Sequence, residues 1–579
     1  MYKASLLAVS SAILFTNVDP ACSQATVCDG TFQAISAQNF IDGISPGWNL
    51  GNTLDAFPNE DSWNNVPVVE SVFDGVKGFG FRSVRLPVTW AYHFVGATNQ
   101  GESPSWTVDP AWLQRVSDVV DMVTARDLYT IVNVHHDSAL WADLSVTGAN
   151  YTMIEEKFYR LWYQIGQKLA CKSSLLAFEP INEPRGESAE HAAELHKLND
   201  IFLQAINDAG GFNPQRVVTL SGPGQDIIRT SLWFEKPDPK YPNPYALQVH
   251  YYGPYDFTSA AWGRTIWGSE EDKAILKSDF SQLRGNFSDI PIVLGEWLVS
   301  PIHSEPAARW KYYDFISRLC LEYGLSPIIW DTGNDHVDRS SSTLRDPTGL
   351  GFHMSALSGA INSLADSTTD ASSESQSSSA FVFHQVGDPI IQQTLPWLLN
   401  GNHVASISDT LGELTEMDDF TVDEQGIQLS ASYLARYFDT TSSTGVKTTL
   451  SISFSEGAAV SVQLVQWSPP GAPVAQSKAP VGDSLRISVD WHGVAKPAAV
   501  AAFKADGTPL VDEWTTVLPS LRRGRTTFGG QWTWDWDQDG VTISESAMSA
   551  VINAGQDTTF MIEAFPRVEG NYVNYTVFP

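Results

Sequence analysis

The sequence predicts an α/β protein: a closed (β/α)8 TIM barrel followed by a Ser/Thr-rich linker and two β-sandwich modules. Short apolar runs rich in β-branched residues recur from Trp48 to Trp330, and helical segments separate several of them. Eight such runs, spaced by roughly 30–50 residues, predict parallel strands that close into one barrel. Beyond residue 380, apolar residues alternate one by one with polar residues, which indicates antiparallel sheets.

The composition is that of a large, acidic, folded protein. Its 579 residues are 43% hydrophobic and 17% charged, which suits a large core and excludes a disordered chain. The 35 Lys and Arg residues against 66 Asp and Glu residues leave a net charge of −31. This charge disfavours nucleic acid and anionic membranes as partners, because both select clustered basic residues. We expect a monomer.

The N-terminus predicts an export signal over residues 1–25. Lys3 precedes an apolar run from Leu6 to Val18, and small residues follow around Ala21. This order is typical of a secretory signal peptide, and the run is too short to span a bilayer. The sequence therefore predicts a secreted, extracellular protein.

The chain has four cysteines, too few for a disulfide scaffold. Removal of the signal peptide leaves Cys28, Cys171 and Cys320, an odd number, so we expect at least one thiol that is free or paired with another chain. Cys171 precedes the fourth apolar run and Cys320 precedes the eighth, half a ring apart. These two should not form a disulfide with each other.

The barrel is predicted over residues 26–365. Its eight apolar runs end near Trp48, Arg85, His136, Glu183, Ser221, Tyr252, Glu296 and Trp330. The clearest helix begins at Asp109-Pro110, where an N-cap residue and a proline precede Trp112, Val116 and Val119 at helical spacing. A doubly wound open sheet is the competing fold, but Gly47–Gly51 lacks the G-x-G-x-x-G spacing expected after its first strand.

The remainder divides into a linker and two modules. Residues 366–379 are mostly Ser and Thr and contain no large apolar residue, which predicts a flexible linker over 366–380. Strand-like alternation follows, as at Leu450, Ile452 and Phe454, and a break falls at Pro469-Pro470-Gly471. We therefore predict one β-sandwich over 381–470 and another over 471–579.

Ionisable and aromatic residues recur where the barrel runs end. The carboxyl ends of the strands form the active-site face of such a barrel, and an unpaired charge is costly to bury, so this placement predicts a functional site. The candidate residues are Arg85, His135, His136, Asn182, Glu183, His250, Tyr252, Glu296 and Trp330.

Glu183 and Glu296 fall on runs four and seven, whose ends face each other across the barrel mouth. Retaining glycoside hydrolysis needs such a pair about 5–5.5 Å apart, one as acid/base and one as nucleophile, whereas a separation near ~8 Å predicts inversion. Asn182 could bind a sugar 2-hydroxyl, Arg85 and Tyr252 could hold Glu296 ionised, and Trp330 could stack on a pyranose. An acid/base role predicts a higher pKa for Glu183 than for Glu296.

Two other interpretations of the strand ends stay open. His135-His136-Asp137 could bind a divalent metal, as in metal-dependent barrel hydrolases, although a further Cys or His-x-His motif is missing. Glu179 lies an even number of residues before Glu183, and we expect it to be the buried partner of a basic residue. We expect no metal and no cofactor.

Four ordered motifs resemble glycoside hydrolase family 5, the secreted β-glucanases and cellulases. They are Gly47-Trp-Asn-Leu-Gly-Asn-Thr-Leu-Asp-Ala56, Phe178-Glu-Pro-Ile-Asn-Glu-Pro-Arg-Gly186, His250-Tyr-Tyr252 and Leu294-Gly-Glu-Trp297. The resemblance covers residues 38–363. It implies that Glu183 is the acid/base and Glu296 the nucleophile, and that the other candidate residues line the subsite beside the cleaved bond. The motifs are most similar to the branch containing endo-1,4-glucanases and xyloglucanases.

The tail carries weaker resemblances. Leu399-Asn-Gly-Asn402 and Leu429–Leu434 resemble immunoglobulin-like modules, and Gly530–Trp536 is similar to carbohydrate-binding modules of family 46. Trp532, Trp534 and Trp536 would share one strand face, either as an exposed sugar-stacking strip or as part of a sandwich core.

These observations predict a secreted, metal-independent, retaining endo-β-1,4-glucanase that acts on cellulose-like, mixed-linkage or xyloglucan chains. Three alternatives remain: a non-catalytic carbohydrate-binding or adhesion protein, a β-mannanase on the same barrel, and a metal-dependent hydrolase. The intact pair Glu183 and Glu296 argues against the first.

Overall fold

A computed structural model describes residues 25–96, 100–259, 264–373, 375–440, 443–512, 524–536 and 538–579. The predicted signal peptide therefore lies almost wholly outside the described residues. Within the described part, no helix is both long enough and apolar enough to cross a membrane.

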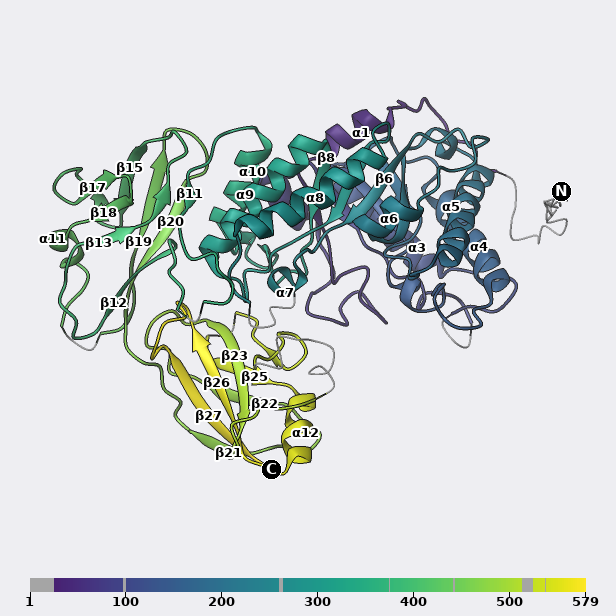
Figure 1. Ribbon diagram of the computed structural model, residues 1–579. Coiled ribbons are helices and arrows are strands. Elements are labelled where there is room, and N and C mark those ends of the chain that lie inside the picture. Colours follow the sequence, from purple (N-terminus) through teal and green to yellow (C-terminus); the bar gives the residue numbers. More distant parts are fainter. Residues whose placement is uncertain are drawn as a thin grey trace, which may run out of the picture.

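The first part of the chain is a closed barrel of eight parallel strands, which confirms the predicted fold class (Figure 1). The strands follow one another around the ring in sequence order, and β1 closes it by pairing with β8. They are β1 (Gly47–Asn49), β2 (Ser83–Leu86), β3 (Tyr129–Asn133), β4 (Leu176–Glu179), β5 (Val218–Asp226), β6 (Tyr245–His250), β7 (Ile292–Glu296) and β8 (Leu325–Ile329). Seven of the eight predicted run ends fall within four residues of an observed strand end, and run five continues five residues past Ser221.

Helices surround the barrel, and the predicted helix after Asp109 is α3, with Asp109 accepting a hydrogen bond from the backbone N–H of Ala111. The barrel helices are α2 (Glu70–Gly78), α3 (Pro110–Thr124), α4 (Tyr151–Leu169), α5 (Ala189–Ala209), α6 (Ile227–Trp233), α7 (Tyr255–Thr258), α8 (Glu270–Asn286), α9 (Pro306–Tyr323) and α10 (Pro347–Leu357). Short 3-10 turns lie at His136–Ala139 and Asn213–Gln215.

Helix α1 (Ala37–Ile44) closes the amino-terminal end of the barrel. Its buried Phe40, Ile41 and Ile44 pack in one cluster with strand residues such as Ile131 and Ile328. The Ser36 side chain caps the helix by accepting the Asn39 N–H. The barrel is therefore plugged at one end, which leaves the carboxyl end of the strands as the open face.

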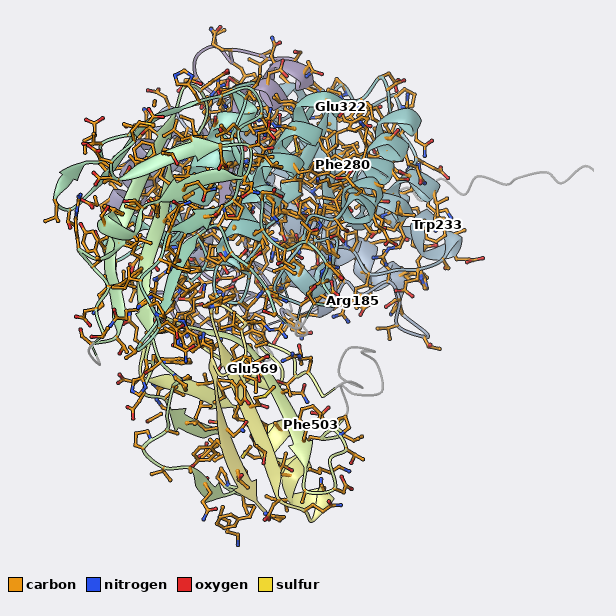
Figure 2. All side chains as sticks on the ribbon, turned by 60° about the vertical axis from the view of Figure 1, so that its left-hand side comes forward. Arg185, Trp233, Phe280, Glu322, Phe503 and Glu569 are labelled. Atoms are coloured by element: carbon orange, nitrogen blue, oxygen red, sulfur yellow. A yellow bond between two sulfur atoms is a disulfide. The ribbon has the colours of Figure 1, made fainter. Side chains whose placement is uncertain are left out.

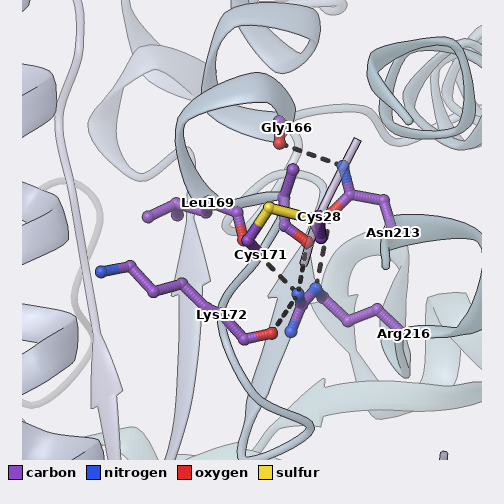
Figure 3. The surroundings of a disulfide bond; sticks show 8 residues. Cys28, Gly166, Leu169, Cys171, Lys172, Asn213 and Arg216 are labelled. Carbon is purple, nitrogen blue, oxygen red and sulfur yellow. Dashed lines mark hydrogen bonds between the residues drawn. A yellow bond between two sulfur atoms is a disulfide. The ribbon is translucent and has the colours of Figure 1, made fainter. Parts of the chain in front are cut away.

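A disulfide joins Cys28 to Cys171 just after α4, and Cys320 is a buried free thiol (Figure 3). The expectation that Cys171 and Cys320 do not pair is confirmed. Beside the disulfide, the fully buried Arg216 donates hydrogen bonds to five backbone carbonyls, those of Leu169, Ala170, Lys172, Ser173 and Leu176. These carbonyls end α4 and begin β4, so Arg216 satisfies acceptors that the helix leaves unpaired.

The middle module consists of short sheets and one helical turn. A five-stranded sheet has the order β12-β20-β19-β15-β16, and a three-stranded sheet has the order β13-β18-β17. Its elements are β12 (Phe381–Gln385), β13 (Gln393–Leu395), β14 (Trp397–Leu398), β15 (Val404–Asp409), β16 (Gly412–Glu413), β17 (Phe420–Asp423), β18 (Gly426–Leu429), α11 (Ala431–Leu434), β19 (Gly445–Phe454) and β20 (Val460–Trp467). Strand β12 runs parallel to β20, an exception to the predicted antiparallel pairing.

The C-terminal module also holds two sheets, ordered β21-β27-β26-β23 and β22-β25-β24, together with a helix. Its elements are β21 (Gln476–Lys478), β22 (Leu485–Ser488), β23 (Pro497–Lys504), β24 (Trp532–Thr533), β25 (Gly540–Ile543), α12 (Glu545–Ala554), β26 (Thr558–Ala564) and β27 (Tyr572–Phe578). This module, yellow in Figure 1, lies beside both the barrel and the middle module. Short strands β9 (Val337–Asp338) and β10 (Thr343–Leu344) pair with each other between β8 and α10, and β11 (Leu364–Ala365) pairs with β14 of the middle module.

The Ser/Thr-rich segment is packed against the barrel, so the expectation of a flexible linker over 366–380 is wrong. Gln376 is buried and accepts a hydrogen bond from the Thr265 hydroxyl at 2.7 Å, and the Ser378 hydroxyl donates to Glu305. The Gln376 backbone N–H donates to Arg567 O in the C-terminal module. Hydroxyl and amide side chains cannot build a core of their own, but here they satisfy polar groups on surfaces that other segments supply.

Candidate active site

Glu183 stands on a strained turn just beyond β4. Its φ is +38°, in the left-handed region that a non-glycine residue rarely adopts. The Glu183 backbone N–H donates to Oε1 of Gln225 at 2.7 Å, and the Gly224 N–H donates to Pro184 O at 2.8 Å. Both partners lie in a bulge of β5, where its register with β6 shifts between Ser221 and Asp226.

Glu296 is the last residue of β7 and is 4% exposed. Arg85, from β2, donates to its Oε1 at 2.5 Å, and the Tyr252 hydroxyl donates to its Oε2 at 2.8 Å. His250 occupies the neighbouring position on β6. Burial raises the pKa of the Glu296 carboxyl and the Glu183 charge adds to this, so the pKa stays above its ordinary value although His250, Arg85 and Tyr252 lower it.

The two carboxylates meet across the barrel mouth with His250 between them. One oxygen of each glutamate and one ring nitrogen of His250 lie within 4.8 Å of one another. His250 Nδ1 is 2.9 Å from Glu183 Oε1 and 3.5 Å from Glu296 Oε2. This spacing is close to the ~5–5.5 Å of retaining pairs and shorter than the ~6.5–9.5 Å of inverting pairs.

The order of the two pKa values is opposite to the expected one. Burial raises the pKa of Glu183, but the hydrogen bond and charge of His250 together with Arg85 outweigh it, so this pKa lies below its ordinary value. The physical reason is the position of His250, whose Nδ1 is 2.9 Å from Glu183 Oε1 but 3.5 Å from Glu296 Oε2. Its hydrogen bond stabilises the ionised form of Glu183, while the Glu183 charge adds to burial in raising the pKa of Glu296.

Glu179 is the buried partner of a basic residue, as expected. It pairs with Arg85 through two hydrogen bonds of 2.7 and 2.8 Å, and both side chains are fully buried. Arg85 also donates to Asn182 Oδ1 at 2.7 Å and to Asn49 Oδ1 at 2.9 Å. Asn49 and Gln225 belong to this network but were missed, because neutral amides at strand ends carry little signal. The Gly222-Pro223-Gly224 break beside Gln225 was the available clue.

His135 and Trp330 form one wall of the site. Their rings are parallel within 2° at a centroid distance of 5.7 Å. His136 lies edge-on to His135 and close to Trp63, which in turn contacts Phe57. The aromatic surface thus extends from Trp330 toward the loop after β1.

All nine predicted barrel residues gather at this face, and eight of them border cavities. A cavity of about 680 Å³ contains both glutamates, Trp330 and His135. A second, of about 470 Å³, contains Glu183, His250, Tyr252 and Tyr255 and continues toward α8. Because both cavities share Glu183, Tyr252 and Tyr255, open space lies on both sides of the acid pair.

The C-terminal module reaches the same cleft. Phe528, Thr533, Trp534 and Asp535 line the larger cavity, and Figure 2 shows the cleft residue Arg185 on the face of the barrel turned toward this module. The indole of Trp536 donates to Asn334 O at 2.6 Å, and Arg345 lies over its ring.

Trp532, Trp534 and Trp536 do not form an exposed strip on one strand face. Trp532 is fully buried in the core of the C-terminal module, so its inclusion in a sugar platform is wrong. Only Trp532 lies in a strand, β24, because the chain leaves the sheet after Thr533. Trp534 faces the barrel cleft and Trp536 forms the contact with the barrel, so the alternation expected of a longer strand does not hold.

Among the residues that the structure describes, two groups of side chains have donor atoms close enough to hold a metal ion. One is Asp55, His135 and His136, and the other is Glu183, His250 and Glu296. The Asp137 carboxylate accepts hydrogen bonds from the Trp90 N–H at 2.8 Å and the Trp141 indole at 2.6 Å. Asp137 is therefore occupied by structural contacts and does not join the two histidines as the third ligand considered from sequence.

A closed parallel barrel with two facing carboxylates at the ends of β4 and β7, in an open cleft with aromatic walls, defines a glycoside hydrolase. The chain belongs to glycosyl hydrolase family 5: the cellulase model of that family matches residues 48–336. A carbohydrate-binding domain X2 model matches residues 376–464.

Known proteins extend this similarity to the whole chain. "Endoglucanase B" of Paenibacillus lautus is 26% identical over 93% of this chain and 91% of its own length. A tri-modular GH5 (subfamily 4) endo-β-1,4-glucanase of Bacillus licheniformis, also solved with cellotetraose, is 31% identical with a TM-score of 0.81, over 94% of this chain and 100% of its own. A family 5 xyloglucanase of Paenibacillus pabuli, solved in complex with ligand, is 27% identical with a TM-score of 0.51 and covers 55% of this chain and 99% of its own.

Proposed function

We propose that the protein is a secreted endo-β-1,4-glucanase that cleaves internal bonds of a β-glucan with retention of configuration. The observation that carries this proposal is the approach of Glu183 and Glu296 to within 4.8 Å in a cleft that is open on both sides. The similarity to a GH5 endo-β-1,4-glucanase solved with cellotetraose supports the glucan backbone. The enzyme acts as a monomer and needs no metal.

Each glutamate has one role in the proposed double displacement. Glu296, held by Arg85 and Tyr252, attacks the anomeric carbon while Glu183 protonates the departing oxygen, and Glu183 then deprotonates the water that releases the glycosyl enzyme. Glu296 is suited to attack because the guanidinium and the phenol fix its direction. Glu183 is suited to proton transfer because it stands at the rim, where the leaving sugar departs.

The remaining candidate residues bind the sugar next to the cleaved bond. Asn182 lines the cavity beside the two glutamates and is suited to hydrogen-bond the 2-hydroxyl, while Trp330 stacked against His135 offers a flat apolar face to the ring. Bound glucan excludes water from Glu183 and so raises its pKa. In the complex Glu183 can then be protonated while Glu296 is ionised, as the first step requires.

The decisive experiment compares Glu183→Ala with Glu296→Ala on cellotetraose and on 2,4-dinitrophenyl β-cellobioside. Since an activated phenol leaves without acid help, Glu183→Ala should retain kcat/KM on the aryl substrate and lose about 10²–10⁴-fold on cellotetraose. Glu296→Ala should lose both. Equal losses in the two variants on the aryl substrate contradict the assignment, and activity that disappears with chelator supports the metal-dependent alternative.

The glucan backbone is decided by a panel of four polymers: cellulose, mixed-linkage glucan, xyloglucan and mannan. The similarity to a family 5 xyloglucanase makes xyloglucan the leading branched substrate. Release of reducing sugar from mannan alone would favour the β-mannanase alternative, and release from none would favour a non-catalytic binding protein.

The proposal also covers the two C-terminal modules and the N-terminal signal peptide. The module over 381–470 is an immunoglobulin-like carbohydrate-binding unit, and that over 471–579 is a family 46-like unit whose Trp534 contributes to the cleft. Residues 1–25 direct export. N-terminal sequencing of the protein from culture medium tests the last point, because a mature chain should begin near residue 26.

A further inference from the structure

The bulge of β5 contains a glutamine whose role no sugar-binding function explains. Gln225 is fully buried, and its own φ of +48° is in the left-handed region. It contacts Glu183, which also has a left-handed backbone, and the two residues are joined by one hydrogen bond. Two unfavourable backbone conformations in contact persist only where the surroundings determine them.

The orientation of the Gln225 amide is fixed by its partners. Its Oε1 accepts the Glu183 backbone N–H at 2.7 Å, and its Nε2 donates to Glu179 Oε1 at 3.0 Å and to the Ser221 hydroxyl at 3.2 Å. A backbone N–H can only donate and a carboxylate can only accept, so a flipped amide would lose both contacts. A residue without one acceptor and one donor at these positions cannot replace it.

The Gln225 amide connects Glu183 to the ion pair that holds Glu296. Glu179 pairs with Arg85, and Arg85 donates directly to Glu296. The Glu183 backbone is therefore tied through Gln225 to the same ion pair that orients Glu296. The side chains of Gln225, Glu179, Arg85 and Glu296 in this series of contacts are all buried, and only the Glu183 carboxylate is partly exposed.

We propose that Gln225 is a positioning residue that holds the Glu183 backbone in its strained conformation and so places the acid/base carboxyl over the leaving oxygen. Without this tie, Glu183 relaxes toward negative φ and its carboxyl swings away from the cleaved bond. Gln225 is fully buried and lines neither cavity, and Glu179 keeps its two hydrogen bonds to Arg85 without it, so the effect of Gln225 is expected in the steps that need the proton of Glu183. The inference rests on the proposed acid/base role of Glu183.

The test is the leaving-group dependence of Gln225→Leu, which removes both polar contacts at similar volume. Since a displacement near 1 Å can cost ~100-fold, kcat/KM on cellotetraose should fall about 100-fold. On 2,4-dinitrophenyl β-cellobioside it should change less than about threefold, because that leaving group needs no proton. Equal losses on both substrates, or no loss on either, overturn the proposal.

Asn243→Leu is the matched control. Asn243 is also a buried amide, and it donates to Asn213 O at 2.8 Å and Arg216 O at 2.9 Å, at the amino-terminal end of the strands. It should lower the unfolding temperature but leave the ratio between the two substrates unchanged. A changed ratio in this variant would attribute the Gln225 result to a general loss of rigidity.

A second variant keeps the proposal testable should Gln225→Leu fail to fold. In Gln225→Glu, a protonated carboxyl can donate to Glu179 while accepting the Glu183 N–H, whereas an ionised one repels Glu179 beside the paired Arg85. The cellotetraose kcat/KM of this variant relative to wild type should therefore rise as the pH falls. A ratio that is flat or that rises with pH contradicts the proposal.

Glu183→Ala in the same assays separates this inference from the proposed function. If Glu183→Ala discriminates between the two substrates but Gln225→Leu does not, the positioning role alone is wrong. If Glu183→Ala does not discriminate, the acid/base assignment fails first.

Discussion

At the scale of single residues, the two glutamates of the acid pair differ in the groups that surround them. Glu296 is enclosed by Arg85, Tyr252 and His250, whereas Glu183 stands half exposed on a turn. In the unliganded protein this gives Glu296 the higher pKa, the reverse of what turnover needs. Two carboxyls this close titrate as a coupled pair, so substrate binding is able to redistribute the proton.

This coupling predicts different pH profiles for kcat/KM and kcat. The profile of kcat/KM reports the free enzyme and that of kcat the complex. Covering Glu183 with glucan raises its pKa, so the alkaline limb, where the acid/base loses its proton, should lie at higher pH in kcat than in kcat/KM. Measurement of both profiles with cellotetraose checks this. Coincident alkaline limbs would mean that substrate does not alter the pKa of Glu183.

Tyr252→Phe should move the acid limb. Burial holds the pKa of Glu296 above its ordinary value, and the Tyr252 hydroxyl opposes this by stabilising the carboxylate. A hydrogen bond to a charged group is worth roughly 1.5–3 kcal/mol, so its removal should raise this pKa further. Because the nucleophile must be ionised, activity should then fall off at higher pH on the acid side.

The neighbouring tyrosine provides the control for that experiment. The Tyr251 hydroxyl donates to Asp279 at 2.8 Å and contacts neither glutamate. Tyr251→Phe should leave the acid limb of kcat/KM in place. A shift of the same size in both variants would point to a general change in the barrel mouth.

Sequence could predict the residues that stand at regular strand ends, because strand periodicity and residue type together locate them. Arg85 and Glu296 are of this kind, and Glu183 follows β4 by four residues. Gln225 escaped because it lies in a bulge, where the chain leaves the regular register, and because a neutral amide costs less to bury than a charge. Its importance depends on contacts with β4 that no local pattern encodes.

At the scale of elements, the disulfide and Arg216 secure the end of the barrel opposite to the cleft. Cys28 and Cys171 are separated by 143 residues, and the bond fixes the N-terminal segment to the end of α4 (Figure 3). Thr26 pairs with Gly210 at the end of α5, so the same segment also contacts the next helix. These contacts lie near the amino ends of the strands and touch no active-site residue.

Removing this bond should lower stability without altering catalysis. Cross-links of this kind typically contribute about 2–4 kcal/mol, so the double variant Cys28→Ser/Cys171→Ser should unfold at lower temperature or denaturant concentration. Its kcat and KM on cellotetraose at 25 °C should match wild type. Reductant should destabilise wild type but not the variant. Loss of activity before unfolding would mean that the bond also supports the cleft.

At the scale of the whole molecule, the C-terminal module and the barrel form one continuous cleft. Trp536 and Lys496 connect the two parts, since the Lys496 ammonium donates to Pro301 O and lies 5.5 Å from the centre of the Trp536 ring. The barrel residue Ile302 belongs to the hydrophobic core cluster of the module. Sequence could predict the modules but not this docking, because each contact joins segments about 200 residues apart.

Trp534→Ala measures the contribution of the module to substrate binding. Trp534 is 5% exposed, so a bound sugar covers only about 10 Å² of its indole, and at ~25 cal/mol per Å² the loss of this contact should raise KM less than about twofold. This loss is expected on polymeric glucan, which can reach the module, while KM for 2,4-dinitrophenyl β-cellobioside should change little. Equal changes on both substrates would show that Trp534 acts through the fold of the cleft instead of by contact with distal sugars.

Composition misrepresented the segment of residues 366–379 for a related reason. Its side chains are too polar to form a hydrophobic core, as the composition indicates. Neighbouring segments nevertheless supply hydrogen-bond partners, as Thr265 does for Gln376. Fastening this segment removes a tether of adjustable length. With a flexible linker, a catalytic domain could reach many bonds around the place where its tail modules bind. With the segment packed in place, the cleft keeps a fixed position relative to the tail modules, so binding of polymer by those modules would also determine which bond lies at the acid pair.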